Sequence, residues 1–195
     1  MEEKADQIGI DFYWIRLGEG GRVVRFCGWV YERVVALHER RRPLSLYHSA
    51  LQVFVEEGRY AIESAPVVDE LGEKRGVVAV GQVGAKWAGR WRIFRYELRR
   101  WKEGVIPDLA EAVESPRRLS NSSEVARKLL ELMEEVPNLV WGRDEIKAGE
   151  MWNSNSQMAW LLEKSGLEAE KIEPPKHGRA IGWKAGVVAA RREAR

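Results

Sequence analysis

The alternation of apolar and polar positions is clearest over residues 46–65, where it predicts a β-hairpin. β-branched and aromatic side chains lie on both sides of a Glu-Gly turn at residues 55–58. This turn sets a register that makes His48 and Glu63 diagonal neighbours on one face of the sheet, about 7 Å apart. A register shifted by one residue would send Glu63 to the opposite face.

A second clear pattern is helical and covers residues 153–165. Apolar residues recur at the spacing of a helix face, and Gly166 is a typical stop signal. The polar triplet 153–155 opens this run. Backbone N–H groups at such a start stabilise an anion or a developing negative charge. Asn and Ser are also common N-cap residues, so an ordinary helix cap explains the same triplet.

Weaker patterns complete the expected fold. Strands are expected at 11–17, 76–81 and 91–101, helices at 24–41 and 121–136, and a strand or short helix at 183–190. Several strands are joined by short turns, so the predicted class is α+β, with a mostly antiparallel sheet packed against helices. Residues 1–10 are expected to form a flexible tail and residues 11–195 a single domain.

Aromatic residues and arginines are interleaved over residues 91–101. Two interpretations fit this pattern. The first is stacking of the aromatic rings on nucleic-acid bases. The second, which we prefer, is a strand whose apolar side chains face the core while its arginines face water.

Composition narrows the classes of function. Lys and Arg number 32 against 30 Asp and Glu, and the net charge of +2 gives no electrostatic reason to expect a nucleic-acid partner. The single cysteine, Cys27, excludes an intrachain disulfide and is expected to be buried and unreactive. His38, His48 and His177 are far apart in sequence, so neither a metal site nor a cofactor is expected.

The same sequence predicts a cytoplasmic protein. Its N-terminus lacks the apolar core of a signal peptide. No apolar run approaches the roughly 18 residues that a membrane span needs. We therefore expect no membrane span.

Three motifs, taken in order, resemble the circularly permuted papain-like (NlpC-type) superfamily. Residues 47–53 look like the histidine strand of the YiiX-type, lecithin retinol acyltransferase-type and desumoylating isopeptidase-type proteins. Residues 61–65 resemble the YiiX-type strand that carries a glutamate as the third site residue. Residues 153–156 lie where the isopeptidase type has Asn-Cys-Asn and a hydroxyl residue. The resemblance covers about residues 11–165.

The resemblance implies a permuted papain-like fold with a catalytic triad in which serine replaces the nucleophilic cysteine. The implied catalytic residues are His48, Glu63 and Ser154, and the implied substrate-binding residues are Asn153, Asn155, Gln52 and Tyr13. The implied function is hydrolysis or acyl transfer on an amide or ester of a small molecule, peptide or lipid. A thiol at a helix start is partly ionised, whereas a serine must lose its proton during attack, so a degenerate site fits the swap.

Several alternatives stay open at this point. A non-catalytic binding module could keep the cleft and lack the chemistry. A structural or interaction protein would be signalled by an exposed aromatic patch around Trp87, Trp91 and Trp101. Ser154 could be a working serine nucleophile, or stand in for an engineered cysteine. The sequence determines neither the substrate nor the oligomeric state.

Overall fold

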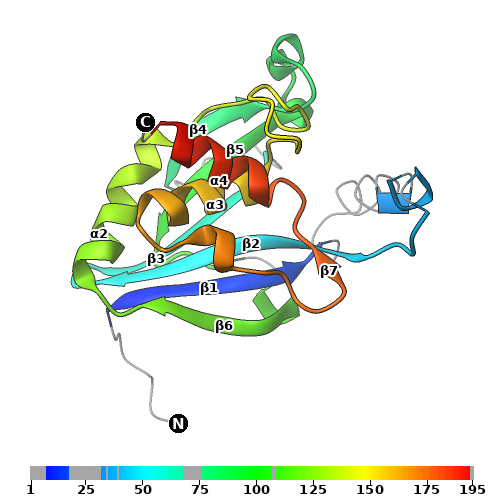
Figure 1. The fold of residues 1–195 in the computed structure, drawn as a ribbon. Helices are drawn as coiled ribbons and strands as arrows, with labels where there is room; N and C mark the ends of the chain where they lie inside the picture. Colours follow the sequence, from blue (N-terminus) through cyan, green and yellow to red (C-terminus); the bar gives the residue numbers. More distant parts are fainter. Residues whose placement is uncertain are drawn as a thin grey trace.

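A central sheet organises the chain (Figure 1). The computed structural model describes residues 8–17, 32–33, 35–38, 40–67, 76–106 and 109–193. Within these residues the sheet has seven strands, six of them in the order β4-β5-β3-β2-β1-β6, with β7 paired to β2. The strands are β1 (Gly9–Arg16), β2 (Ser45–Val55), β3 (Gly58–Pro66), β4 (Val77–Gln82), β5 (Arg95–Lys102), β6 (Ala112–Ser120) and β7 (Gly178–Arg179). The pairing of β2 with β7 is parallel, and the other pairings are antiparallel. The predicted α+β class with a mostly antiparallel sheet is confirmed.

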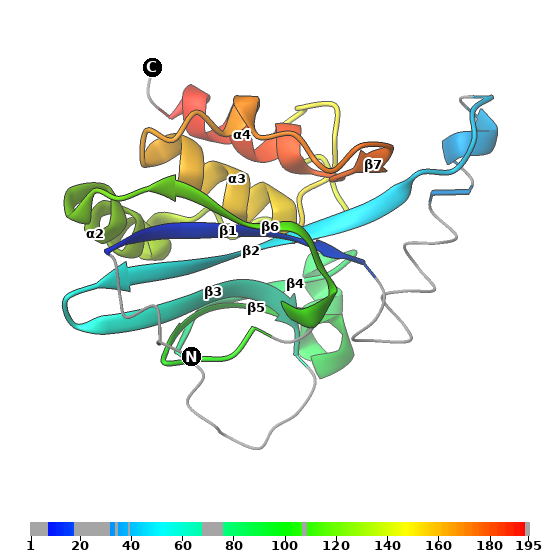
Figure 2. The same ribbon diagram turned by 90° about the horizontal axis from the view of Figure 1, so that it is seen from below.

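Three α-helices cover one face of this sheet (Figure 2). They are α2 (Ser123–Leu132), α3 (Ser154–Lys164) and α4 (Trp183–Arg192). The helix predicted at 121–136 begins as its sequence suggests, because the Ser122 hydroxyl accepts a hydrogen bond from the Val125 amide at 3.3 Å. The segment expected to be a strand or short helix at 183–190 is α4.

The main hydrophobic core lies between the helices and the sheet. Its largest fully buried side chains include Phe12, Leu51, Ile62, Leu98, Leu129, Trp152 and Trp160. The close contact between α3 and α4 depends on Gly186, where a methyl group would lie 2.1 Å from the Ser156 carbonyl oxygen. Glycine therefore lets these two helices approach more closely than any other residue would.

A second, smaller core lies on the opposite face of the sheet. Its buried residues are Tyr13, Ile15, Ala50, Ala61 and Ile106. Side chains alternate between the two faces along a strand. In β2 the apolar residues Tyr47, Leu51, Val53 and Val55 join the helix-side core, and Ala50 joins the other.

One edge of the sheet is covered by a loop. β4 and β6 are the edge strands of the six-strand path. Residues 138–141 run along β4, where the Asn138 amide group donates to the Val80 carbonyl at 3.0 Å. The Trp141 amide donates to the Gln82 carbonyl at 2.9 Å. This segment therefore satisfies backbone groups of β4 that the sheet does not pair.

Several predicted boundaries were wrong. β1 begins at Gly9 and Ile10 is fully buried, so the expected tail of residues 1–10 overlaps the first strand. The strand expected at 91–101 begins only at Arg95, and residues 92–94 form a 3₁₀ turn. β6 and β7 were not predicted. Of the helix expected at 24–41, the described residues 32–33 and 35–38 are helical, whereas residues 40–41 form a turn and a bend. Cys27 lies outside the described residues.

Candidate functional site

The start of α3, which the sequence singled out, is closed by its own side chains. Asn153 Oδ1 accepts hydrogen bonds from the Asn155 and Ser156 amides at 2.9 and 3.3 Å. In return, Ser156 Oγ accepts from the Asn153 amide at 3.0 Å, which completes a capping box. These amide groups at the helix start are thus already satisfied. Of the two interpretations of this triplet, the geometry favours the ordinary helix cap.

Asn155 attaches α3 to the sheet. Its side-chain amide donates to the carbonyl oxygens of Tyr47 and Ile181 at 2.9 and 3.0 Å, and its Oδ1 accepts from the Ser49 hydroxyl at 2.9 Å. Asn155 is 4% exposed. These contacts indicate a structural role for Asn155 rather than the expected substrate-binding role, because its side-chain polar atoms already form hydrogen bonds within the protein.

His48 lies on the other side of the sheet from α3. Tyr47 and Ser49, its neighbours in β2, are buried on the helix side, and Ser49 contacts α3 directly. Strand alternation therefore turns the half-buried His48 to the opposite face, where it is paired across the ladder with Ile15 of β1. The structure does not bring His48 and Ser154 together.

The hairpin register agrees with the sequence-based prediction where the two strands pair. Phe54 lies opposite Arg59, and the ladder of β2 and β3 runs from Val55–Gly58 to Leu51–Ile62. His48 and Glu63 lie beyond its last pair. The predicted register was correct over the turn, although it does not fix the contact between the two residues.

Glu63 is part of a buried ion-pair group. Arg99 Nη1 donates to Glu63 Oε1 at 3.0 Å, and Arg99 Nε donates to Glu97 Oε2 at 3.0 Å. The Arg99 and Glu63 side chains are 4% and 8% exposed. The Glu63 carboxylate therefore pairs β3 with β5 through Arg99. This is a structural role and not that of a residue that orients a catalytic histidine.

Tyr13 and Gln52, the remaining predicted substrate contacts, bind each other. The Tyr13 hydroxyl donates to Gln52 Oε1 at 2.8 Å, and both residues are buried. Burial, followed by the negative charge of Asp11, raises the pKa of Tyr13 to about 12. The phenol therefore stays neutral near pH 7. The pair closes the small core rather than lining an opening.

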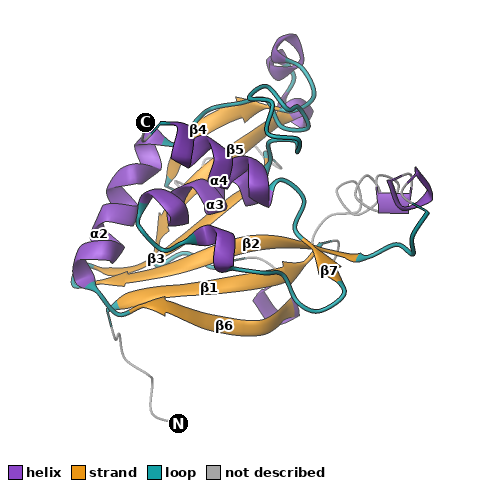
Figure 3. Cartoon of the chain, in the orientation of Figure 1, coloured by secondary structure: helices purple, strands orange, loops and turns teal. Residues whose placement is uncertain are grey.

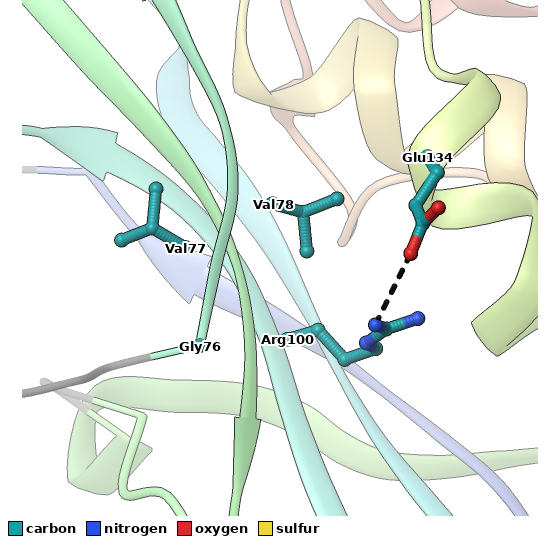
Figure 4. Close-up of a pocket in the computed structure, with 5 residues that line it drawn as sticks. All are labelled: Gly76, Val77, Val78, Arg100 and Glu134. Atoms are coloured by element: carbon teal, nitrogen blue, oxygen red, sulfur yellow. Dashed lines mark hydrogen bonds and ion pairs between the residues drawn. The ribbon is translucent and has the colours of Figure 1, made fainter.

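A hollow of about 380 Å³ lies at the start of β4 (Figure 4). It is lined by Gly76, Val77, Val78, Arg100 and Glu134. Arg100 donates to the Leu130 carbonyl at 2.9 Å and to Glu134 at 3.4 Å, so its charge is already paired. The residues that line the hollow include no nucleophile with an adjacent base.

The most prominent exposed feature is the segment between β4 and β5. Two 3₁₀ turns, Lys86–Arg90 and Arg92–Phe94, project beyond the ends of these strands (Figure 3). We call residues 86–95 the tip. Of the eight exposed large hydrophobic side chains among the described residues, four belong to the tip: Trp87 (67% exposed), Trp91 (44%), Ile93 (75%) and Phe94 (39%).

The aromatic rings of the tip contact one another at their edges. Trp91 lies 5.6 Å from Trp87 and 6.3 Å from Phe94, between ring centroids, in T-shaped arrangements. The interpretation that the apolar residues at the start of 91–101 face the core was therefore wrong. The alternative of an exposed aromatic patch is correct for Trp87 and Trp91, whereas Trp101 is only half-exposed on β5.

Backbone contacts hold the tip in place. The Arg95 side chain donates to the carbonyl oxygens of Gly89 and Arg90, and Arg143 donates to the Gly84 carbonyl. The Gly84 amide donates to the Trp141 carbonyl at 2.8 Å. The tip is thus braced from within and from the neighbouring loop, which preorganises its exposed side chains.

The remaining chemical candidates are not supported by the described residues. Within them, no group of three or more His, Cys, Asp or Glu side chains is placed to hold a metal ion. None of the described helices is both long and apolar enough to cross a membrane. His38 and His177 are exposed.

Comparison with known proteins adds no family to this description. No protein-family model, curated protein or solved structure matches the chain. The resemblance to permuted papain-like proteins therefore stays a prediction from the order of three motifs.

Proposed function

We propose that the protein is a non-catalytic binding module and that the tip is its contact surface. The observation that carries this proposal is the concentration of large exposed hydrophobic side chains in one braced segment of ten residues, 86–95. Exposed apolar surface costs free energy in water and is typical of interaction sites. Trp and Arg, which dominate the tip, are also the residues most enriched at the energetic centres of interfaces.

The arrangement of the predicted catalytic residues supports a non-catalytic role. A serine nucleophile needs a base within hydrogen-bonding reach and a group that orients the base. Here Ser154 begins a helix on one face of the sheet, and His48 and Glu63 belong to strands whose alternation turns them to the other face. We therefore rank the hydrolase hypothesis below the binding module.

Site-specific photo-crosslinking tests the binding surface even though the ligand is unidentified. A photoreactive benzoylphenylalanine replaces Trp87 in the tip or, as a control, Val105 in the loop after β5. The two native side chains have closely similar exposure, 67% and 65%. In the cell that makes the protein, irradiation should yield crosslinked species from position 87 and few or none from position 105.

Two results would contradict the proposal. Equal crosslinking at positions 87 and 105 would show that the tip is no preferred contact surface. Turnover of an activated ester that is lost in both Ser154→Ala and His48→Ala would show a working hydrolase. Ester turnover that persists in both variants would come from general surface reactivity and would leave the proposal standing.

A further inference from the structure

The tip is basic as well as aromatic. Residues 84–95 contain Lys86, Arg90, Arg92 and Arg95 and no carboxylate. The charge of the whole chain, +2, conceals this concentration because the acidic residues lie elsewhere in the sequence. Charge acts on a ligand locally, within about 10 Å at moderate salt. The expectation that nucleic acid is not a partner rested on the total charge and does not apply to this segment.

One cation of the tip, Arg90, lies over its indole rings. The Arg90 guanidinium carbon is 4.0 Å from the centroid of the Trp91 ring and 5.7 Å from that of Trp87. Lys86 is 80% exposed and approaches Glu145 no closer than 3.8 Å. An ion pair so exposed contributes little free energy, so Lys86 can exchange this partner for another anion.

We propose that the tip binds single-stranded nucleic acid, an inference that rests on the proposed role of the tip as a contact surface. Bases stack on the exposed faces of Trp87 and Phe94, and phosphates contact Lys86 and Arg90. A single strand offers flat bases at regular intervals along a negatively charged backbone. The bases match the indole rings of the tip, and the phosphates match its cations. The preorganised tip lowers the entropic cost of binding.

The shape of the tip favours a single strand over a duplex. Proteins that recognise duplex DNA place a helix or a two-stranded ribbon in a groove. The tip has only 3₁₀ turns of five and three residues, Lys86–Arg90 and Arg92–Phe94. Bases in a duplex are already stacked on each other, whereas those of a single strand are free to stack on protein rings.

The position of Arg90 disfavours an anionic membrane as the ligand. A membrane-inserting loop buries its apolar tip and leaves its cations at the level of the headgroups. Arg90 lies over the ring of Trp91. Inserting that ring among acyl chains would carry the guanidinium with it, which costs free energy.

Binding can be measured by fluorescence anisotropy with labelled oligothymidylate and oligouridylate of about 12 nucleotides, a length within the range of one single-strand site. We expect saturable binding at about 50 mM salt. Affinity should fall with salt along a log–log slope between about −1 and −3, as expected for two to four phosphate contacts. The duplex form of the same length should bind at least about fivefold more weakly.

Substitutions in the tip test the assignment of contacts. Trp87→Ala should weaken binding by about tenfold, because stacking of one base is lost. Arg90→Gln should weaken it by about threefold and make the salt slope shallower. Two controls remove the same kinds of group elsewhere: Val105→Ala removes an exposed apolar side chain, and Arg127→Gln an exposed cation of α2. Both should bind within about twofold of the unmodified protein.

The possible failures of the two proposals can be told apart. Absence of oligonucleotide binding at about 50 mM salt, or binding that Trp87→Ala and Arg90→Gln leave unchanged, would overturn the inference. The inference would also be overturned if the protein bound phosphatidylglycerol vesicles but no oligonucleotide, and if Trp87→Ala abolished the vesicle binding. Crosslinked species from position 87 provide the second criterion. Nuclease should degrade their partner, and a partner degraded by protease alone would overturn the nucleic-acid inference but leave the binding-module proposal intact.

Discussion

The hydroxyl of Ser49 on β2 donates a hydrogen bond to the side-chain oxygen of Asn155 on α3 across 2.9 Å. This contact identifies the face of β2 that the helix covers, the face whose apolar side chains join the main core. Because residues alternate along the strand, it also indicates that His48 faces away from α3. His48 is one position away from Ser49 and therefore points to the opposite face of the sheet. This separates it from Ser154, the predicted nucleophile at the start of α3.

Asn155→Ala should lower the free energy of unfolding by about 3 kcal/mol, because the Ser49 hydroxyl and the carbonyl of Tyr47 lose their partner in a buried setting. Chemical denaturation with a linear extrapolation measures the change. Ser154→Ala, at the preceding position and half-exposed, should cost no more than about 0.5 kcal/mol. Similar losses in the two variants would contradict the role given to Asn155.

Arg99→Met should cost about 3–5 kcal/mol of stability, because it leaves the carboxylates of Glu63 and Glu97 beside each other without their cation. The matched control is Arg100→Met, the same change at the next residue. Arg100 pairs with an exposed carboxylate at 3.4 Å and donates to the Leu130 carbonyl at 2.9 Å, and loss of these two contacts should cost about 1–2 kcal/mol. Adding Glu63→Met to Arg99→Met should recover part of the loss. A double variant less stable than Arg99→Met would argue against the loss of the Arg99–Glu63 ion pair as the cause.

Gly186→Ala should destabilise the protein although alanine favours helices. The added methyl group would lie 2.1 Å from the Ser156 carbonyl oxygen, so α3 and α4 must separate. We expect a net loss of about 2 kcal/mol, since overpacking outweighs the roughly 1 kcal/mol gained in helix propensity. Thermal unfolding of Gly186→Ala and of Lys184→Ala, an exposed position of the same helix, makes the comparison. A rise in melting temperature for Gly186→Ala would show that the helices are not in tight contact.

Stability should fall between pH 10 and about pH 12, and Tyr13 should be one cause. Its pKa is raised to about 12 in the folded protein, first by burial and then by Asp11, while in the unfolded chain it stays near 10. The unfolded state therefore loses the proton first as pH rises, so the contribution is complete below pH 10 and is lost toward pH 12. Urea midpoints across this range should decline less steeply for Tyr13→Phe. An unchanged slope would assign the alkaline loss to other groups.

The elements that were predicted correctly have strong local patterns. The hairpin of β2 and β3 has its turn residues and its alternation within about twenty positions, and α2 has its cap at Ser122. β6 could not be recognised in this way, because Glu114, Arg117 and Arg118 interrupt any apolar alternation over residues 112–120. It is a strand because it pairs with β1, which lies far earlier in the chain. Such long-range pairing leaves no periodic signal.

The candidate site shows a different limit of sequence analysis. The residue types and order of His48, Glu63 and Ser154 fit a triad, but a motif order does not state which face of a sheet a later helix will cover. The tip shows the same limit in reverse. Its aromatic and basic composition was visible, whereas the exposure of Trp91 and Phe94 accompanies a 3₁₀ turn, Arg92–Phe94, at the place where a strand was expected.

The segment 138–141 has a consequence for the behaviour of the protein at high concentration. An edge strand with unpaired backbone groups is a template for joining sheets of separate molecules, and Val77 and Val80 give β4 exposed apolar side chains as well. By binding the Val80 and Gln82 carbonyls, Asn138 and Trp141 occupy the positions that a foreign strand would need. Resistance to aggregation at this edge is therefore supplied by a loop from another part of the chain.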